Sequence, residues 1–133
     1  MKLIVSSLLR KILRIFNITF PKRVGNKTFY IPLIGGAGLS NLKSHEVWMD
    51  DLLEKLIPSQ DHVYSFFDIG ANIGQTLLKV RAISKKVHYI GFEPNPACIH
   101  YLNSLVAKNS NIISTNNTLI IPVGLSNETS LCK

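Results

Sequence analysis

The chain has 133 residues, 46% of them hydrophobic, which is enough apolar material for one modest core and so predicts one domain. Its formal net charge of +7 comes from residues 1–30, which hold basic side chains and no carboxylate, so the remainder is electrically neutral. A neutral body argues against a surface that follows phosphates, and we expect no nucleic-acid partner.

Residues 1–27 are predicted to form a basic N-terminal arm that begins with an amphipathic helix. Apolar residues recur at helical spacing, with Arg10 and Arg14 on the opposite side: Val5, Leu8, Leu9, Ile12 and Phe16. Two roles remain open for this helix. Residues 1–20 could lie on an anionic membrane surface, or the helix could pack on its own domain.

The arm is neither a signal peptide nor a membrane span, because Arg10 interrupts the short apolar run at 3–9 and no small-residue cleavage site follows. We therefore expect a cytoplasmic protein, with peripheral membrane contact as the alternative. Cys98 and Cys132 are too few for a disulfide framework, and neither has a histidine at metal-ligand spacing. Both are expected to be reduced thiols, and no metal site is predicted.

The predicted domain, residues 28–133, opens with strand-like sequence from Thr28 and then a glycine-rich loop up to Asn41, which is a candidate lid. A helix is expected after Ser44, ending before Pro58. Its buried face is predicted to consist of Met49, Leu52, Leu53 and Leu56.

From residue 63 the pattern alternates between strands and helices. We expect strands at 63–69, 87–92 and 119–123 and helices at 73–84 and 96–109. Asn95 and Pro96 suit the cap and first position of the second of these helices, whose apolar face is Ile99, Leu102 and Val106. Such alternation indicates right-handed βαβ units in a parallel sheet. Because Pro122 cannot donate a hydrogen bond to a neighbouring strand, it is expected at a sheet edge or at the end of its strand.

The most informative local sequence is the turn that follows strand 63–69. Asp68 ends the strand, and Gly70 and Gly74 flank the turn. In open α/β sheets ligands bind beyond the carboxyl ends of the strands, and glycine there lets the backbone approach a ligand closely. Gly74 would also let the following helix pack closely on the strand.

Glu93 ends the next strand, where an acidic side chain can accept hydrogen bonds from both hydroxyls of a ribose. The pairing of this carboxylate with the glycine turn favours an adenosine-type ligand. The alternative for Glu93 is a solvated carboxylate near the positive N-terminus of the helix expected at 96–109.

Asn72 and Gln75 have the spacing of a helix cap and its reciprocal partner, so Asn72 could serve mainly to start the helix. Asp68 could only anchor the turn, or it could hold the ammonium group of a methionine moiety, directly or through water. A dinucleotide is disfavoured, because Asn72 occupies the position that must be glycine and Asp68 would repel a pyrophosphate.

Three segments together resemble FkbM-type methyltransferases: residues 67–74, residues 91–96 and residues 121–126. The resemblance covers roughly residues 28–133. It implies S-adenosylmethionine as cofactor and methylation of a hydroxyl on a sugar, lipid or other metabolite. The positions that match the cofactor site are Asp68, Gly70, Ala71, Asn72, Gly74 and Glu93, with Leu125 and Ser126 in the segment near the adenine.

The resemblance also implies a Rossmann-like class I sheet, of which this chain supplies only the first three parallel strands and their flanking helices, after the basic helix. We therefore expect a truncated or incomplete chain, and no catalytic residue can be named. Strand 63–69, apolar on both faces, would then expose an unpaired edge and favour self-association. Three functions stay open: an interrupted methyltransferase, a cofactor-binding half that needs a partner chain, and a non-catalytic interaction module.

Overall fold

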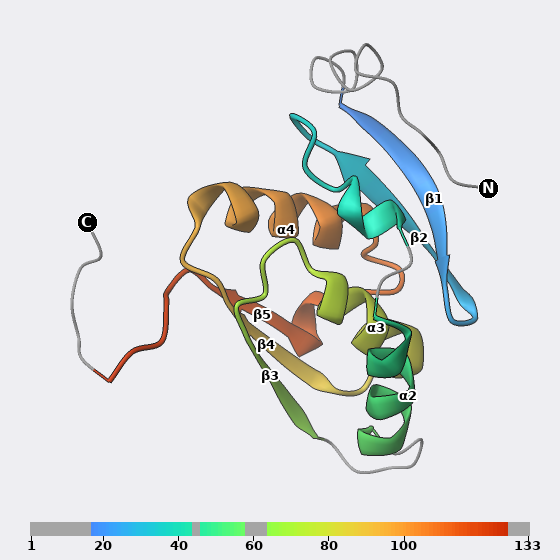
Figure 1. The fold of residues 1–133 in the computed structure, drawn as a ribbon, viewed down its shortest axis with the longest axis vertical. Helices are drawn as coiled ribbons and strands as arrows, with labels where there is room; N and C mark the ends of the chain where they lie inside the picture. Colours follow the sequence, from blue (N-terminus) through green and yellow to red (C-terminus); the bar gives the residue numbers. More distant parts are fainter. Residues whose placement is uncertain (1–16, 44–45, 58–63, 128–133) are drawn as a thin grey trace.

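The computed structural model describes residues 17–43, 46–57 and 64–127 (Figure 1). In chain order its elements are β1 (Ile18–Val24), β2 (Lys27–Leu33), the 3-10 turn η1 (Ser40–Leu42), α2 (Val47–Leu56), β3 (Ser65–Ile69), α3 (Gln75–Ile83), β4 (His88–Phe92), α4 (Pro96–Lys108), the 3-10 turn η2 (Thr115–Asn117) and β5 (Thr118–Ile121).

The sheet is the parallel, three-stranded sheet that the alternating pattern predicts. Its order is β3-β4-β5, and Asp68 lies opposite Gly91 in the register of β3 and β4. Strand β5 pairs with β4 and forms one edge, and Pro122 follows directly after its last residue, so the expected edge position of this strand is confirmed. The crossover helices α3 and α4 explain how consecutive strands come to run in the same direction.

Helix α4 begins where its local signals predict. The Asn95 side chain accepts a hydrogen bond from the Ala97 amide at 2.9 Å, and Pro96 takes the first helical position. Its most buried residues are Tyr101, Leu102 and Leu105, while Ile99 and Val106 are half-buried. Of the predicted face only Leu102 is fully buried, and the buried face includes Tyr101 and Leu105, because α4 packs on both the sheet and β2.

The last part of the predicted N-terminal arm forms a strand, β1, which makes an antiparallel hairpin with β2. The expectation of an arm up to residue 27 is thus wrong for Ile18–Val24, which pairs in full register with Lys27–Leu33. Lys22 hid the period-two pattern of β1, because this basic residue is half-buried and stands on the same side of the strand as Phe20 and Val24. The predicted amphipathic helix and its membrane contact fall on residues that lie largely outside the described part of the chain.

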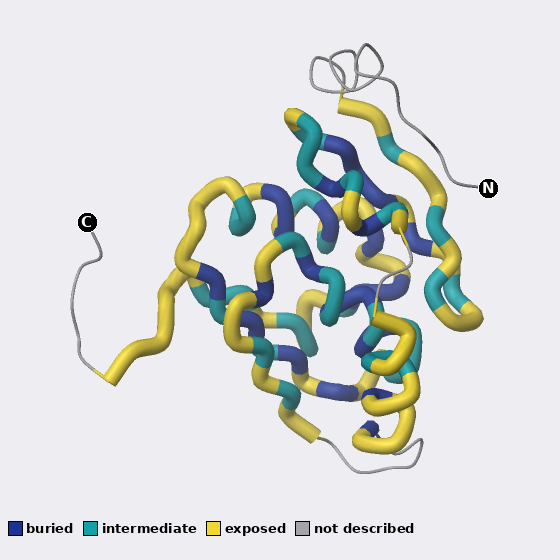
Figure 2. Tube along the Cα trace, in the orientation of Figure 1, coloured by how far each residue is buried: buried dark blue, intermediate teal, exposed yellow. Residues whose placement is uncertain are grey.

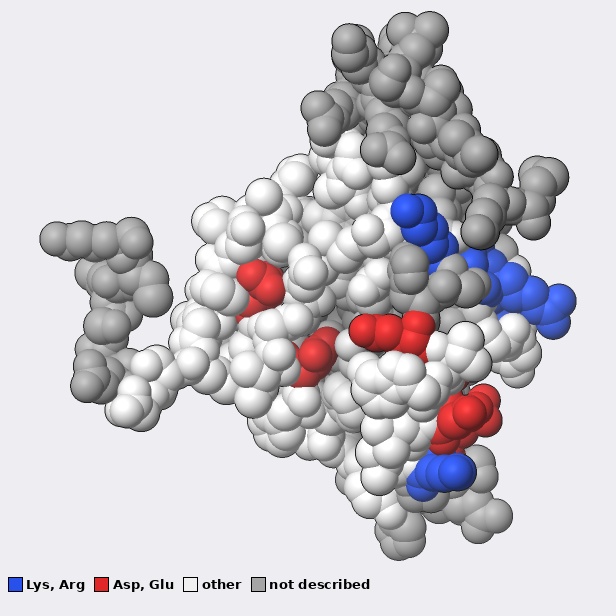
Figure 3. Space-filling model, viewed as in Figure 1, with Lys and Arg blue, Asp and Glu red and all other residues white. Residues whose placement is uncertain are grey.

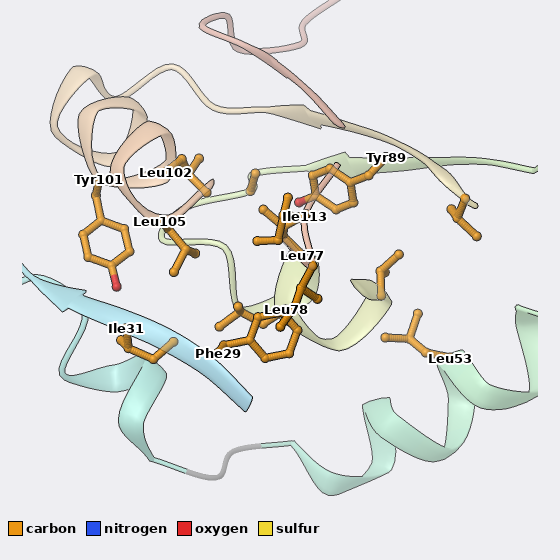
Figure 4. Packing of buried hydrophobic residues seen from close by; sticks show 14 of the residues in the cluster. Phe29, Ile31, Leu53, Leu77, Leu78, Tyr89, Tyr101, Leu102, Leu105 and Ile113 are labelled. Atoms are coloured by element: carbon orange, nitrogen blue, oxygen red, sulfur yellow. The ribbon is translucent and has the colours of Figure 1, made fainter. Parts of the chain in front are cut away.

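The core lies between the sheet and the hairpin, with α3 and α4 in the middle layer (Figure 4). Phe29 and Ile31 of β2 reach it from one side and Tyr89 of β4 from the other, and all three are fully buried. The hairpin therefore completes the hydrophobic core of the domain and is not a separate appendage.

Helix α2 matches its predicted range and half of its predicted face: Met49 and Leu53 pack on the core, but Leu52 and Leu56 are exposed. Only Leu53 of the helix is buried, and Ile57 just after it is 5% exposed, whereas Leu56 is 62% exposed. Among the described residues the helix packs against α3, and this contact leaves Leu52 and Leu56 exposed.

Both helices of the sheet's crossovers cover the same face, and the opposite face is apolar and open. Burial alternates along β3, as Figure 2 shows: Phe66 and Asp68 are half-buried, while Phe67 and Ile69 are 61% and 69% exposed. Leu119 of β5 is also exposed on the described surface. None of the described helices is long and apolar enough to cross a membrane.

Candidate functional site

The turn after β3 is held by the end of β4. The amides of Gly70 and Ala71 both donate to the Phe92 carbonyl, at 2.9 Å and 3.0 Å. Gly70 has a φ of +85°, and nothing lies within 4 Å of the place where its side chain would begin. The backbone at Gly70 is thus open to a ligand, as expected of a glycine that permits close approach.

Gly74 has a different role from Gly70. Its φ is +80°, and a Cβ atom there would lie 2.8 Å from Leu102 Cδ2 and 3.0 Å from Leu105 Cδ2. The missing side chain therefore lets leucines of α4 close on the turn. The sequence predicts that Gly74 lets α3 pack on β3, but the side chains closest to the place of its Cβ belong to α4.

Asn72 does not cap a helix. Helix α3 begins at Gln75, its cap residue is Gly74, and no side chain makes the cap hydrogen bond. The capping role predicted for Asn72 and Gln75 is wrong, because Asn72 sits two residues too early, in the left-handed region with a φ of +48°. Its side-chain oxygen instead accepts a hydrogen bond from the Cys98 thiol at 3.4 Å.

Glu93 joins the two loops at the carboxyl end of the sheet. One carboxylate oxygen accepts the Asn72 amide and the other accepts the Asn95 amide, each at 2.8 Å. The side chain is only 7% exposed, so the alternative of a solvated carboxylate is wrong. A carboxylate has about four acceptor positions, so two bonds still leave it able to accept from a ligand.

Asp68 lies beneath the same turn, where it pairs with a side chain that the sequence analysis did not single out. The Tyr89 hydroxyl donates to Asp68 Oδ2. Partial burial raises the pKa of Asp68, and the hydrogen bond from Tyr89 opposes that rise. The signal that could have found Tyr89 is its position two residues before Gly91, the residue opposite Asp68.

Cys98 is the other site residue that the sequence analysis missed. It lies in the first turn of α4, and burial and the nearby Glu93 carboxylate raise the pKa of its thiol. A neutral thiol is consistent with its role as hydrogen-bond donor to Asn72. In the sequence, the only signal for the contact between Cys98 and Asn72 is the position of Cys98 in the first helical turn after Asn95 and Pro96.

The segment after β5 runs beside the loop that carries Glu93. The place of a Cβ on Gly124 is 3.6 Å from Pro94 Cβ, next to Glu93 in the chain. Leu125 is 53% exposed and Ser126 is exposed. Their assignment to an adenine site stays a prediction, whereas Asp68, Gly70, Ala71, Asn72 and Glu93 are brought together by the contacts above.

A cavity of about 190 Å³ lies elsewhere, between the hairpin, α2 and α3. It is lined by both basic and acidic side chains, and Lys79 on its wall forms an ion pair with Asp50 at 3.1 Å. None of the eight predicted site residues lines it. Figure 3 shows described acidic and basic side chains interspersed on this face of the molecule, without a continuous basic surface.

No protein-family model matches the sequence, and no curated protein matches it. Among solved structures, TYW2 of Pyrococcus horikoshii in complex with MeSAdo is similar over 82% of this chain, with 13% identity and a TM-score of 0.53. A proposed transferase from the same organism is similar over 82% of the chain, with 12% identity and a TM-score of 0.51.

The fold of this chain is similar to the folds of these two proteins. A proposed caffeoyl-CoA O-methyltransferase from Staphylococcus aureus also resembles the chain over 64% of its length, with 24% identity and a TM-score of 0.49. At these identities the likeness concerns the fold alone. The match spans 37% of each Pyrococcus protein and 39% of the Staphylococcus protein, so this chain spans less than half the length of these proteins.

Proposed function

We propose that this chain is the cofactor-binding part of an S-adenosylmethionine-dependent methyltransferase of the FkbM type. The observation that carries the proposal is the bond from the Asn72 amide to Glu93, which joins the glycine turn and the acid that ends β4 at one point. In this arrangement Glu93 accepts from the ribose hydroxyls, Gly70 leaves room for the cofactor above the backbone, and Asp68 faces the amino group of the methionine moiety.

The residues fit such a group on two counts. The space above Gly70 is open, and both carboxylates retain unused acceptor positions after their bonds to Asn72, Asn95 and Tyr89. The bound cofactor supplies an electrophilic methyl group. This chain's part is then to hold the cofactor in one orientation, which lowers the entropic barrier to an in-line transfer.

The acceptor in this proposal is a hydroxyl oxygen on a sugar, a lipid or another metabolite. No described residue is assigned as the base that removes the hydroxyl proton. That group would come from a further polypeptide, which would add strands beside β3 and cover the open face at Phe67 and Ile69. The open face thus favours, as a second candidate, a cofactor-binding half that acts only with such a partner.

Calorimetric titration of the folded chain with S-adenosylmethionine tests the proposal. We expect saturable binding, and we expect Glu93→Ala to weaken it roughly 10- to 150-fold, because a hydrogen bond to a charged group contributes about 1.5–3 kcal/mol. Glu54→Ala, at an exposed position of α2, is the matched control and should leave the dissociation constant unchanged.

Glu93 also holds two backbone amides, so circular dichroism must show that its variant is folded. Asp68→Asn is the second variant, because it keeps the size of the side chain and an acceptor for Tyr89 while removing the charge. We expect weaker binding here too. A folded chain that gives no heat with the cofactor would overturn the proposed function, and an unaltered affinity in folded Glu93→Ala would overturn the role of Glu93.

A further inference from the structure

Tyr89 lies under the candidate site with its ring in the core and its hydroxyl at Asp68. The side chain is fully buried, and its ring stacks against Phe66 with centroids 6.0 Å apart and planes 8° apart. Phe66 is directly opposite Tyr89 in the sheet, and Asp68 is two residues further along the same face of β3. The ring must therefore lean along the strand for its hydroxyl to reach the carboxylate.

Gly91 makes this lean possible. It lies opposite Asp68, between the Tyr89 ring and the end of β4. A Cβ atom on Gly91 would lie 2.9 Å from Tyr89 Cε1 and 3.1 Å from Ala71 Cβ. Any larger residue would occupy the space that the ring now fills, so Gly91 and Tyr89 act together to bring a donor to Asp68.

We propose that Tyr89 is a positioning residue for cofactor binding, which fixes Asp68 through Oδ2 and leaves Oδ1 for the amino group of the ligand. This inference rests on the proposed function, since it assigns a purpose to the Asp68 carboxylate. The bond is internal, however, and can be measured without any ligand. If the side chain at position 89 served only to fill the core, phenylalanine would serve as well as tyrosine.

The charge state of Asp68 supports this role. Burial raises the pKa of Asp68, and the hydrogen bond from Tyr89 lowers it by stabilising the carboxylate. Tyr89 itself stays protonated, because burial and the Asp68 charge raise its pKa, with buried Arg81 of α3 acting in the opposite direction. Without the hydroxyl, Asp68 would take up its proton at a higher pH.

The test is Tyr89→Phe, with Tyr101→Phe as the matched control. Tyr101 is equally buried, and its hydroxyl contacts Asn41 and not Asp68. Carbon-detected NMR gives the pKa of Asp68 in each protein, and calorimetry with S-adenosylmethionine gives the affinity between about pH 4 and about pH 8. We expect Tyr89→Phe to raise the pKa of Asp68 and to weaken binding about tenfold near its transition.

The pH dependence has a definite sign. Binding of a cationic amino group needs the Asp68 carboxylate, so affinity falls as the pH drops through the pKa of Asp68. In Tyr89→Phe this fall should begin at a higher pH, whereas Tyr101→Phe should follow the wild type. If the wild type binds and Tyr89→Phe shows the same pKa and the same profile, the positioning role is refuted. If the wild type does not bind, the proposed function fails, and the NMR titration still decides whether Tyr89 controls Asp68.

Discussion

Gly70 and Gly74 share a left-handed backbone and a turn, yet their surroundings give them opposite tasks. At Gly70 the space for a side chain is empty, whereas at Gly74 it is filled by Leu102 and Leu105. Gly70 therefore leaves open space beside the backbone, where the proposed ligand would fit, and Gly74 lets the turn and α4 come into contact. Both glycines can be recognised in the sequence, but which atoms surround each of them is known only from the structure.

This contrast predicts different costs for the same substitution. Gly74→Ala adds about 1–3 kcal/mol of overpacking to about 1–2 kcal/mol of left-handed strain, whereas Gly70→Ala carries the strain alone. Urea denaturation should therefore show Gly74→Ala as clearly the less stable variant. Gly70→Ala should stay folded while its affinity for S-adenosylmethionine falls. Equal losses of stability in the two variants would contradict the packing role of Gly74.

At the scale of elements, the hairpin and α4 are joined by the side chain of Asn109, the residue that ends the helix. Its oxygen accepts the Tyr30 amide at 2.7 Å, and its nitrogen donates to the carbonyls of Tyr30 and Leu105, each at 2.8 Å. Asn109 is fully buried, and its side chain takes up the Tyr30 amide and carbonyl of β2, which no strand of the described chain pairs with. The hairpin is thereby fixed on the domain.

Asn109→Ala should lower the free energy of unfolding by about 1–3 kcal/mol, because it leaves the part-buried amide and carbonyl of Tyr30 without their partner side chain. Amide hydrogen exchange at Tyr30 should accelerate by more than exchange in β4. Asn103→Ala, at an exposed position of the same helix, is the control and should change stability by less than about 0.5 kcal/mol. Similar exchange at Tyr30 in both variants would show that Asn109 does not hold the hairpin.

At the scale of the whole molecule, the described elements cover one face of the sheet and leave Phe67 and Ile69 exposed on the other. Parallel sheets are normally buried on both faces, and an open edge with apolar side chains is a template for association. Phe67 and Ile69 on β3 form that surface together with Leu119 of β5. The similar solved structures are more than twice as long as the part that this chain matches, which suits a surface meant to be covered.

We expect the isolated chain to cover this face with a second copy of itself. Light scattering after size exclusion should show a mass that rises with concentration, and the double substitution Phe67→Lys with Ile69→Lys should return it to the monomer. Leu56→Lys removes an equally exposed apolar side chain from α2 and should leave association unchanged. A wild type that is monomeric at all concentrations, or a Leu56→Lys variant that dissociates just as well, would contradict this expectation.

The sequence by itself determined the features that depend on neighbours in the chain. The cap at Asn95, the alternation of strands and helices and the acid and glycines at the strand ends are local signals, and they suffice for the start of α4, for the parallel sheet and for naming candidate site residues. The β1 strand was missed because half-buried Lys22 interrupts its apolar alternation. The exposure of Leu52 and Leu56 on α2 was missed because periodicity does not say whether a neighbour covers a face.

Only the tertiary structure decided the pairings between distant residues. Asp68 with Tyr89, Glu93 with the Asn72 amide and Asn109 with Tyr30 each depend on strand register and on small shifts of packed elements. A hydrogen bond forms within a few tenths of an ångström, whereas a sequence pattern places an element only to within a residue or two. The chemistry of this site was therefore visible in the chain, but its geometry had to come from the fold.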